Sequence, residues 1–187
     1  ELAEIFGEPE YLKGYGRRNV TLNAVAPTTS SAFILGQVSQ SIEPIWSNCY
    51  VKDVAKMKVT IKNPILKDLL DSIGKNNKET WDSIKKADGS VQHLDFLNDN
   101  QKDVFRTFAE INQLQLVEQA AVRQKYIDQT QSLNLAFDPT DSPKFINEVH
   151  QSAWRLGIKT LYYLRTDSVI NGDIGSRTEL DCLSCDG

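Results

Sequence analysis

Hydrophobic residues recur along the chain with two different spacings, which indicates that helices alternate with strands. Helical spacing is clearest over 64–73, where a proline opens the run and a glycine follows it, and over 113–129. Apolar or alternating runs predict strands at 20–26, 50–54, 58–62, 132–137 and 158–165. Because alternating helices and strands are typical of α/β proteins, and several of these strands look buried on both faces, the pattern predicts an α/β fold built on a barrel or a parallel sheet.

The remaining elements are predicted from breakers and caps. A helix over 143–156 has well-marked bounds, with Ser142 as cap, Pro143 at the first position and Gly157 as the stop. Further helices are expected at 2–6, 76–86 and, capped by Asp99 or Asn100, up to 108, and the apolar side of the 113–129 helix is assigned to Leu116, Ala120, Val122, Tyr126 and Ile127. After Thr166 the sequence is polar and without periodicity, so residues 167–187 are expected to form a mobile tail.

Composition narrows the class of protein. The chain has 187 residues, 40% of them hydrophobic and 25% charged, which allows one domain with a real core. The net charge is -4 and no long basic run exists, so a nucleic-acid surface is not supported. No apolar stretch approaches the length of a membrane span, which needs about 20 residues. There is no signal-peptide pattern, and the expected compartment is the cytosol or an equivalent reducing space.

A run of hydroxyl side chains follows the predicted strand at 20–26. After Pro27 come Thr28, Thr29, Ser30 and Ser31, and then an apolar turn at 33–35. A strand that leads into a helix presents unpaired backbone N–H groups, and four hydroxyls add donors, so this loop could hold a diphosphate. It has no lysine and is not a Walker loop. The commoner use of such residues is as a helix cap with spare hydroxyls, which stays open as the alternative.

The cysteines suggest redox chemistry at the C-terminus. Cys182 and Cys185 form a Cys-x-x-Cys pair, which in a reducing compartment is typical of a redox dithiol or of half a zinc site. Zinc needs about four ligands, and the other candidates, Cys49, His93 and His150, are widely spaced. The favoured hypothesis is therefore a dithiol on a flexible arm, with no metal. Cys49 stands alone and is interpreted as a small buried hydrophobe.

Two adjacent tyrosines, Tyr162 and Tyr163, lie in the predicted strand at 158–165. Aromatic residues are common in strands, so taken alone they indicate core packing. Successive strand residues point to opposite faces of a sheet. The two rings can therefore share one site only if the backbone departs from regular pleating.

Several segments resemble the large subunit of class I ribonucleotide reductases. The stretch 157–166 is similar to that family's tyrosine-pair strand, and 182–185 is similar to its C-terminal dithiol. Residues 18–31 resemble its substrate-phosphate loop, and 41–50 resemble the segment that follows this loop. Residues 63–69 are similar to the next helix start, and 126–134 to the family's passage from a helix to a strand. These blocks stand in the family's order, and their details resemble the eukaryotic and T4-like phage branch. The stretch from Pro27 to Pro44 is about one residue longer than the family's pattern.

The resemblance implies a fold and an activity. Residues 1–166 would be the C-terminal part of a ten-stranded α/β barrel, and 167–187 a flexible tail that carries the redox dithiol. The enzyme would reduce ribonucleoside diphosphates to deoxyribonucleoside diphosphates by radical chemistry. Tyr163 and Tyr162 would relay the radical, with Tyr162 on the side of the reactive cysteine. The hydroxyls of 28–31 would hold the substrate diphosphate, and Cys182 and Cys185 would reduce the active-site disulfide by thiol exchange.

The resemblance also implies partners. A separate small subunit would carry a diiron-tyrosyl or related radical cofactor, this chain would hold none, and thioredoxin or glutaredoxin would reduce the tail. The family's Asn-x-Cys-x-Glu loop is absent from this sequence, which begins at Glu1 without a methionine. We therefore expect activity only in combination with an N-terminal part of the large subunit, in the cytoplasm, which is the host's if a phage encodes the chain. A partial barrel would also have open strand edges, so obligate assembly is expected. The alternatives are a non-catalytic module that binds the small subunit and, less favoured, a free-standing dithiol reductase.

Overall fold

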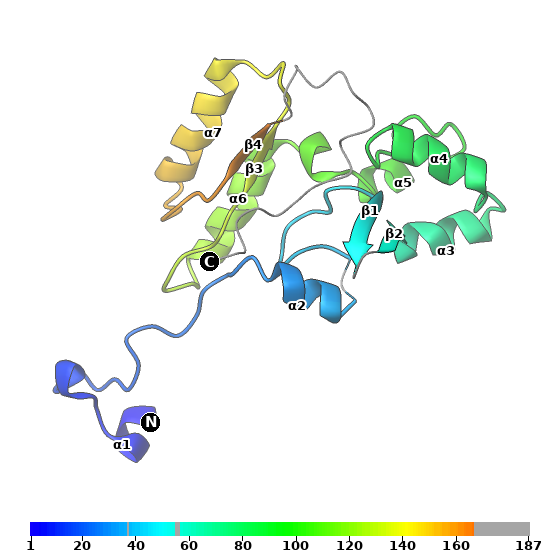
Figure 1. Cartoon of the computed structure of the whole chain (residues 1–187). Helices are drawn as coiled ribbons and strands as arrows, with labels where there is room; N and C mark the ends of the chain where they lie inside the picture. Colours follow the sequence, from blue (N-terminus) through cyan, green and yellow to red (C-terminus); the bar gives the residue numbers. More distant parts are fainter. Residues whose placement is uncertain (37, 55–56, 167–187) are drawn as a thin grey trace.

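The computed structural model describes residues 1–36, 38–54 and 57–166. Helices and short strands alternate along these ranges and form a body from which the N-terminal segment projects (Figure 1). The elements are α1 (Leu2–Phe6), a 3-10 turn η1 (Glu10–Leu12), α2 (Thr29–Ile34), β1 (Cys49–Val54), β2 (Met57–Lys62), α3 (Pro64–Ser72), α4 (Lys78–Lys86), α5 (Asp99–Val104), a second 3-10 turn η2 (Phe108–Glu110), α6 (Gln113–Gln124), β3 (Leu135–Phe137), α7 (Pro143–Arg155) and β4 (Leu164–Thr166).

One hydrophobic cluster is formed by residues of β1, of the helices α3 and α4 and of the segments that flank α5. The hairpin is antiparallel, with a register that runs from Cys49↔Lys62 to Val54↔Met57. The helix α3 begins where the sequence predicts it, because the Asn63 side chain accepts hydrogen bonds from the N–H groups of Ile65 and Leu66. The buried side chains of this cluster are Cys49, Leu66, Leu70, Trp81, Ile84, Val91, Leu94, Leu97 and Phe105.

The side chain of Asn48 ties this cluster together from inside. It is 0% exposed, and its Nδ2 donates to the carbonyl oxygens of Gly89 (2.9 Å) and Phe105 (2.8 Å). Its Oδ1 accepts a hydrogen bond of 2.8 Å from Asn63 Nδ2. Because a buried amide is costly unless its hydrogen bonds are made, these contacts fix the start of β1 against the turn at 88–89 and the cap of α3.

A second cluster surrounds the parallel pair β3–β4. The helices α6 and α7 pack against each other and beside these strands (Figure 1). The helix α7 has the predicted start, since Ser142 Oγ accepts from the Phe145 N–H and Pro143 takes the first position. The buried side chains are Phe108, Leu116, Val117, Ala120, Ala121, Leu133, Leu135, Ala136, Phe137, Val149, Ala153 and Ile158.

The predicted strand at 20–26 is wrong. In this segment Val25 makes an isolated parallel bridge to Gln131, and Leu22 is 76% exposed. The carboxylate of Asp128 accepts hydrogen bonds from the backbone N–H groups of Leu22 (2.6 Å) and Asn23 (3.0 Å). Since a side chain satisfies these donors, they do not form a ladder with a neighbouring strand.

The predicted helix over 113–129 is too long, and three residues of its assigned apolar side, Val122, Tyr126 and Ile127, are wrong. The helix α6 ends at Gln124, whose Nε2 donates to the carbonyl oxygens of Ile127 and Gln129 in the turn that follows. Tyr126 lies beyond the helix and is 79% exposed. Val122 is also exposed, because two positions along a helix rotate a side chain from the face of Ala120 to the opposite face.

Other boundaries also change. The strands expected at 132–137 and 158–165 shorten to β3 and β4, and α5 is capped by Asn98 and ends at Val104. A parallel pair is confirmed at β3–β4, whereas β1–β2 is antiparallel. The two sheets have two strands each and form no closed barrel within the described residues. The tail predicted to be mobile, 167–187, lies outside them.

Gly89 generates a test of this packing. Its φ is +87°, and a Cβ added there would overlap Ser47 Oγ and lie 2.7 Å from the Asn48 backbone nitrogen. Gly89→Ala should lower the free energy of unfolding, measured with urea, by about 1–3 kcal/mol more than the matched change Gly74→Ala. Gly74 also has positive φ but has open space around it, so that variant loses about 1–2 kcal/mol through backbone strain alone. Equal losses in the two variants would contradict the close packing of Gly89.

Candidate functional site

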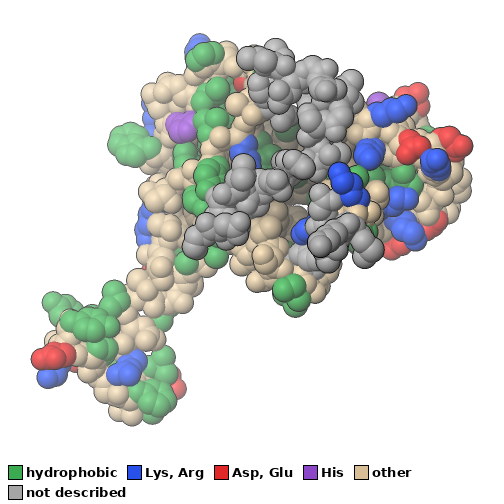
Figure 2. All heavy atoms as spheres, in the orientation of Figure 1, with side chains coloured by type: hydrophobic (Ala, Val, Ile, Leu, Met, Phe, Trp, Pro, Cys, Tyr) green, Lys and Arg blue, Asp and Glu red, His purple; other side chains and the backbone are tan. Residues whose placement is uncertain are grey.

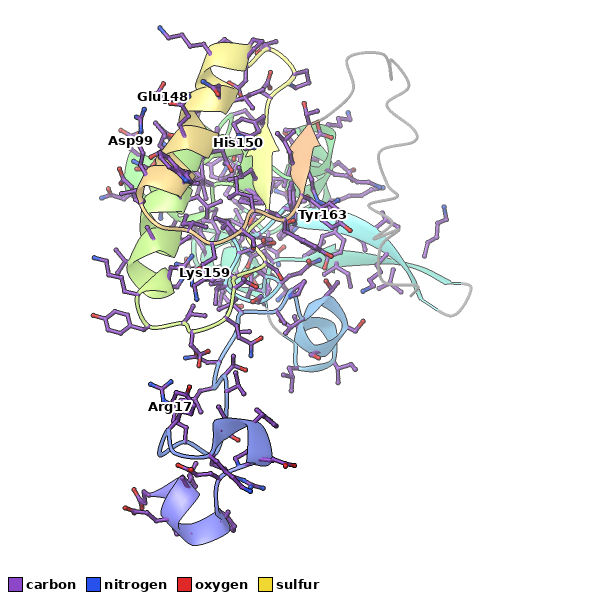
Figure 3. All side chains as sticks on the ribbon, turned by 90° about the vertical axis from the view of Figure 1, so that its left-hand side faces the viewer. Arg17, Asp99, Glu148, His150, Lys159 and Tyr163 are labelled. Atoms are coloured by element: carbon purple, nitrogen blue, oxygen red, sulfur yellow. The ribbon has the colours of Figure 1, made fainter. Side chains whose placement is uncertain are left out.

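The rings of Tyr162 and Tyr163 lie against each other. Their centroids are 4.1 Å apart and their planes are inclined by 51°. Tyr162 is 47% exposed and Tyr163 is half-buried. Tyr163 lies on the side of β4 that is turned away from α7 (Figure 3). The structure thus brings two consecutive side chains to one place, as the hypothesis of a shared site requires.

The backbone reason for this contact is a bulge. Leu133 O accepts from Tyr162 N (2.8 Å), and Leu135 N donates to Tyr163 O (2.9 Å). In a regular parallel ladder, the groups on either side of Asn134 would bond to the N–H and C=O of one residue. Here two residues, Tyr162 and Tyr163, oppose one, which is the definition of a β-bulge. A bulge breaks the alternation of side chains, and this explains how the rings can meet.

Asn134 occupies the position opposite the bulge. Its Oδ1 accepts a hydrogen bond of 3.3 Å from Tyr163 N, the N–H that the irregular ladder leaves over. Glu43 accepts from the same residue: its Oε1 lies 3.1 Å from Asn134 N and 2.8 Å from Nδ2, and its Oε2 lies 3.1 Å from Nδ2. Glu43 is only 7% exposed. Since a buried carboxylate is costly without donors, Asn134 both satisfies Glu43 and is oriented by it.

Arg165 places a positive charge on the face of Tyr163. Its guanidinium carbon lies 5.2 Å from the centroid of the Tyr163 ring and 5.6 Å from that of Trp46. Trp46 is in turn held edge-on against Phe108, with centroids 4.4 Å apart. The Arg165 Nε is buried and has no hydrogen-bond partner within the part of the chain that the structure describes. Cation–π attraction therefore contributes to fixing the Tyr163 ring.

The hydroxyl run begins helix α2. Thr28 has a φ of +49°, and its carbonyl oxygen accepts from Ala32 N in the first turn. Ser30 and Ser31 are exposed. Thr29 Oγ1 donates to Gln40 Oε1 at 3.1 Å. A helix start at the hydroxyl run is thereby confirmed, although the strand expected before it is absent and 33–34 belong to the helix rather than to a turn. The exposed hydroxyls could donate to an anion.

A series of hydrogen bonds connects the hydroxyl run with the tyrosine pair. Thr29 bonds to the Gln40 side chain, and the backbone oxygen of Gln40 accepts from Glu43 N at 3.0 Å. The Glu43 carboxylate then bonds to Asn134, which bonds to Tyr163. Two groups that are far apart in the sequence are therefore parts of one connected structure.

The other candidate ligands are separate from this site. Cys49 is buried, and burial raises the pKa of its thiol, an effect that the nearby Lys62 partly offsets. The interpretation of Cys49 as a buried hydrophobe is thus confirmed. His93 bonds to Ser83 Oγ (2.7 Å), and His150 Nδ1 bonds to Ile146 O (2.8 Å). The ranges 1–36, 38–54 and 57–166 contain no group of three or more residues that could hold a metal ion. Cys182 and Cys185 lie outside the described residues.

The N-terminal segment carries its own hydrophobic surface. Leu2, Ile5, Phe6, Tyr11 and Tyr15 are all exposed on it. Figure 2 shows hydrophobic side chains on the part of the molecule that projects from the body. No helix in the described part of the chain is both long and apolar enough to span a bilayer.

Comparison with known proteins identifies the family. Residues 9–164 match the model of the ribonucleotide reductase barrel domain. The alpha subunit of the class Id ribonucleotide reductase of Actinobacillus ureae superposes with a TM-score of 0.79 at 50% identity, covering 89% of this chain and 30% of that one. The chain therefore belongs to the ribonucleotide reductase family, and residues 9–164 correspond to a part of that family's barrel domain.

The curated relatives are longer than this chain. The ribonucleoside-diphosphate reductase large subunit of Invertebrate iridescent virus 3 is 41% identical over 198 residues, covering 100% of this chain and 31% of the relative. The putative large subunit of Frog virus 3 is 40% identical, with 100% and 34% covered. The large subunit of Danio rerio is 40% identical over 84% of this chain and 20% of its own length. The chain thus spans about a third or less of the relatives it matches.

Three residues of the site were not found by sequence reasoning. Glu43 belongs to a segment that the resemblance picked out but to which it gave no role. Asn134 lies within the predicted strand 132–137 and Arg165 at the end of the predicted strand 158–165, where neither polar side chain indicated a partner. No local pattern marks any of the three, because their partners lie far away along the chain.

The environment of Cys49 yields a test by alkylation. In a Cys182→Ser/Cys185→Ser background, Cys49 should react with iodoacetamide at pH 8 about tenfold or more slowly in the native chain than in urea. Burial both limits access and raises the pKa of the thiol, so less thiolate is present at that pH. The rates are measured by mass spectrometry. Equal rates in native and unfolded chains would contradict a structural role for Cys49.

Proposed function

We propose that this chain supplies part of the catalytic machinery of a ribonucleoside-diphosphate reductase large subunit. The observation that supports it best is the ring contact of Tyr162 and Tyr163 at 4.1 Å. The family membership gives the reaction class, in which ribonucleoside diphosphates become deoxyribonucleoside diphosphates. Because the chain covers about a third of the viral relatives, the rest of the large subunit is needed to complete the active site.

In this proposal the tyrosine pair relays a radical. A small subunit that carries a diiron-tyrosyl or related radical cofactor would supply the oxidant, and Tyr163 would give up one electron and its phenolic proton to it. The Tyr163 phenoxyl radical then takes an electron and a proton from Tyr162, and the Tyr162 radical takes them from a cysteine thiol to leave a thiyl radical. Each step moves one electron together with one proton, so no net charge accumulates in the site. Ring contact shortens the path between the two tyrosines.

The hydroxyl run is proposed to bind the substrate. Thr28, Thr29, Ser30 and Ser31 would donate to the diphosphate together with backbone N–H groups at the start of α2. The exposure of Ser30 and Ser31 supports this assignment, since both can reach a ligand without rearrangement. Because these hydroxyl and N–H donors are uncharged, they would bind the diphosphate of substrate and product reversibly.

The tail is proposed to restore the enzyme after each turnover. A thiolate of Cys182 or Cys185 attacks the active-site disulfide, which forms a mixed disulfide and releases one active-site thiolate. The second tail thiol, as a thiolate, then attacks the first tail sulfur and displaces the other active-site thiolate, which leaves the tail oxidised and the site reduced. Thioredoxin or glutaredoxin would reduce the tail disulfide in turn. The cytoplasm, which keeps thiols reduced, is the proposed location.

The relay generates a direct test. Tyr162→Phe and Tyr163→Phe should each abolish conversion of CDP to dCDP when the chain is combined with the N-terminal part and the small subunit, because phenylalanine has no phenolic hydrogen. Binding to the small subunit, measured by surface plasmon resonance, should be unchanged. Tyr126→Phe is the matched control and should keep full activity, since Tyr126 is an exposed tyrosine beyond α6. Full turnover in either pair variant would favour the non-catalytic binding module instead.

The hydroxyl run generates a second test. Ser30→Ala/Ser31→Ala should raise the KM for CDP about tenfold or more and leave kcat nearly unchanged, because a lost hydrogen bond to a charged group costs about 1.5–3 kcal/mol. Ser72→Ala, which removes a hydroxyl from α3 that bonds to Leu69 O, is the control. An unchanged KM in the double variant would assign these hydroxyls to helix capping alone.

A further inference from the structure

The contact between the tyrosine rings depends on a bulge that local sequence does not encode. Tyr162 and Tyr163 have no glycine or proline beside them that would force an irregular backbone. The bulge leaves one N–H, that of Tyr163, without its place in the ladder. Whatever accepts this N–H stabilises the bulge over a regular strand, in which the two rings would point to opposite faces.

We propose that Asn134, held in place by Glu43, is the positioning residue of the tyrosine pair. Asn134 Oδ1 accepts the displaced N–H of Tyr163 at 3.3 Å. This role rests on the proposed radical relay, which it explains in structural terms: Asn134 touches neither substrate nor radical and acts through the backbone of Tyr163.

The chemistry of the three groups requires an asparagine at this position. One end of its amide must accept from Tyr163 N and the other must donate to a carboxylate. The donor, Nδ2, lies 2.8 Å and 3.1 Å from the two oxygens of Glu43, so the carboxylate determines which end of the amide faces the bulge. An aspartate at this position would set two carboxylates against each other, and a leucine would leave both Glu43 and the Tyr163 N–H without this partner.

Glu43 is itself fixed at both ends. Its backbone N–H donates to Gln40 O, and its carboxylate also accepts from the backbone N–H of Asn134 at 3.1 Å. It is nearly fully buried, so it cannot turn towards solvent without breaking these bonds. Glu43 and Asn134 therefore form a rigid support for the bulge, and they connect the two tyrosines to the loop that precedes β1.

The two side chains permit an exchange of donor and acceptor as a test. Asn134→Asp removes the donor and opposes two carboxylates. Adding Glu43→Gln restores a complementary pair, because the new glutamine amide can donate through its Nε2 to one oxygen of the new carboxylate while the other oxygen accepts from Tyr163 N. The double variant has the same charge as the wild type and differs from it in where the amide nitrogen lies.

The first measurement is of the ring contact, and it needs no enzymatic activity. The full chain carries 3-fluorotyrosine at position 163, and its fluorine NMR shift is compared with and without Tyr162→Leu. In the wild type this change should move the signal well beyond the effect of the control Tyr126→Leu, because the neighbouring ring is removed. In Asn134→Asp the response should fall to the level of the control. In Glu43→Gln/Asn134→Asp it should return.

The second measurement is of turnover in the assembled reductase. Asn134→Asp should lower kcat about 100-fold with little change in KM, because a small misplacement of reacting groups has an effect of this size. The double variant should regain most of the wild-type kcat. If Asn134→Asp does not fold, as judged by circular dichroism, the proposal is tested by the fold and the ring contact of the double variant. Recovery of both fold and ring contact supports the proposal.

Two outcomes overturn the positioning role. One is a folded Asn134→Asp chain that keeps the wild-type ring response. The other is a double variant that does not fold, or that folds without the ring contact. If the ring contact follows the expected pattern but the wild-type assembly shows no reductase activity, the proposed function fails while the positioning role stands.

Discussion

The hydrogen bonds between the buried carboxylate of Glu43 and Asn134 are the interaction on which the arrangement of the site depends. Glu43 is nearly fully removed from water, and an unpaired carboxylate there would be strongly unfavourable. Asn134 satisfies it with its backbone and side-chain N–H groups and uses its remaining oxygen for the displaced N–H of Tyr163. A single buried charge thereby determines the orientation of an amide, the amide stabilises a bulge, and the bulge allows two tyrosine rings to meet.

The segment 43–48 extends this constraint to the whole body. At one end of the segment, the Glu43 carboxylate accepts a hydrogen bond from Asn134, which precedes β3. In the middle, Ile45 O accepts from Phe108 N at 2.8 Å. At the other end, the Asn48 side chain bonds to the turn at 88–89 and to Asn63, the cap of α3. This short segment without regular structure thus connects both hydrophobic clusters. Its polar groups are buried and satisfied, which makes the connection rigid, because any shift would leave costly unpaired groups.

Membership of the ribonucleotide reductase barrel domain gives this construction its significance. The radical relay proposed above requires aromatic rings at fixed separation, and side chains on a regular strand would not provide it from consecutive positions. The structure obtains the contact from the backbone, and the Arg165 guanidinium lies over the rings of both Tyr163 and Trp46. The short parallel pair β3–β4 therefore has a structural role, because the bulge forms where these two strands begin to pair.

The sequence by itself determined the elements whose signals are local. Pro64 and Ser142 mark helix starts, Gly157 follows a helix end, and the runs at 50–54 and 58–62 predicted the strands β1 and β2 but not their antiparallel pairing, because caps and periodicity act within a few residues. The order of motifs also indicated the family and the pair Tyr162-Tyr163. Only the tertiary structure decided that 20–26 is not a strand, that the rings touch, and that Glu43 and Asn134 hold them. These outcomes depend on hydrogen bonds between residues 106 and 91 positions apart, and no local pattern of residues specifies such partners.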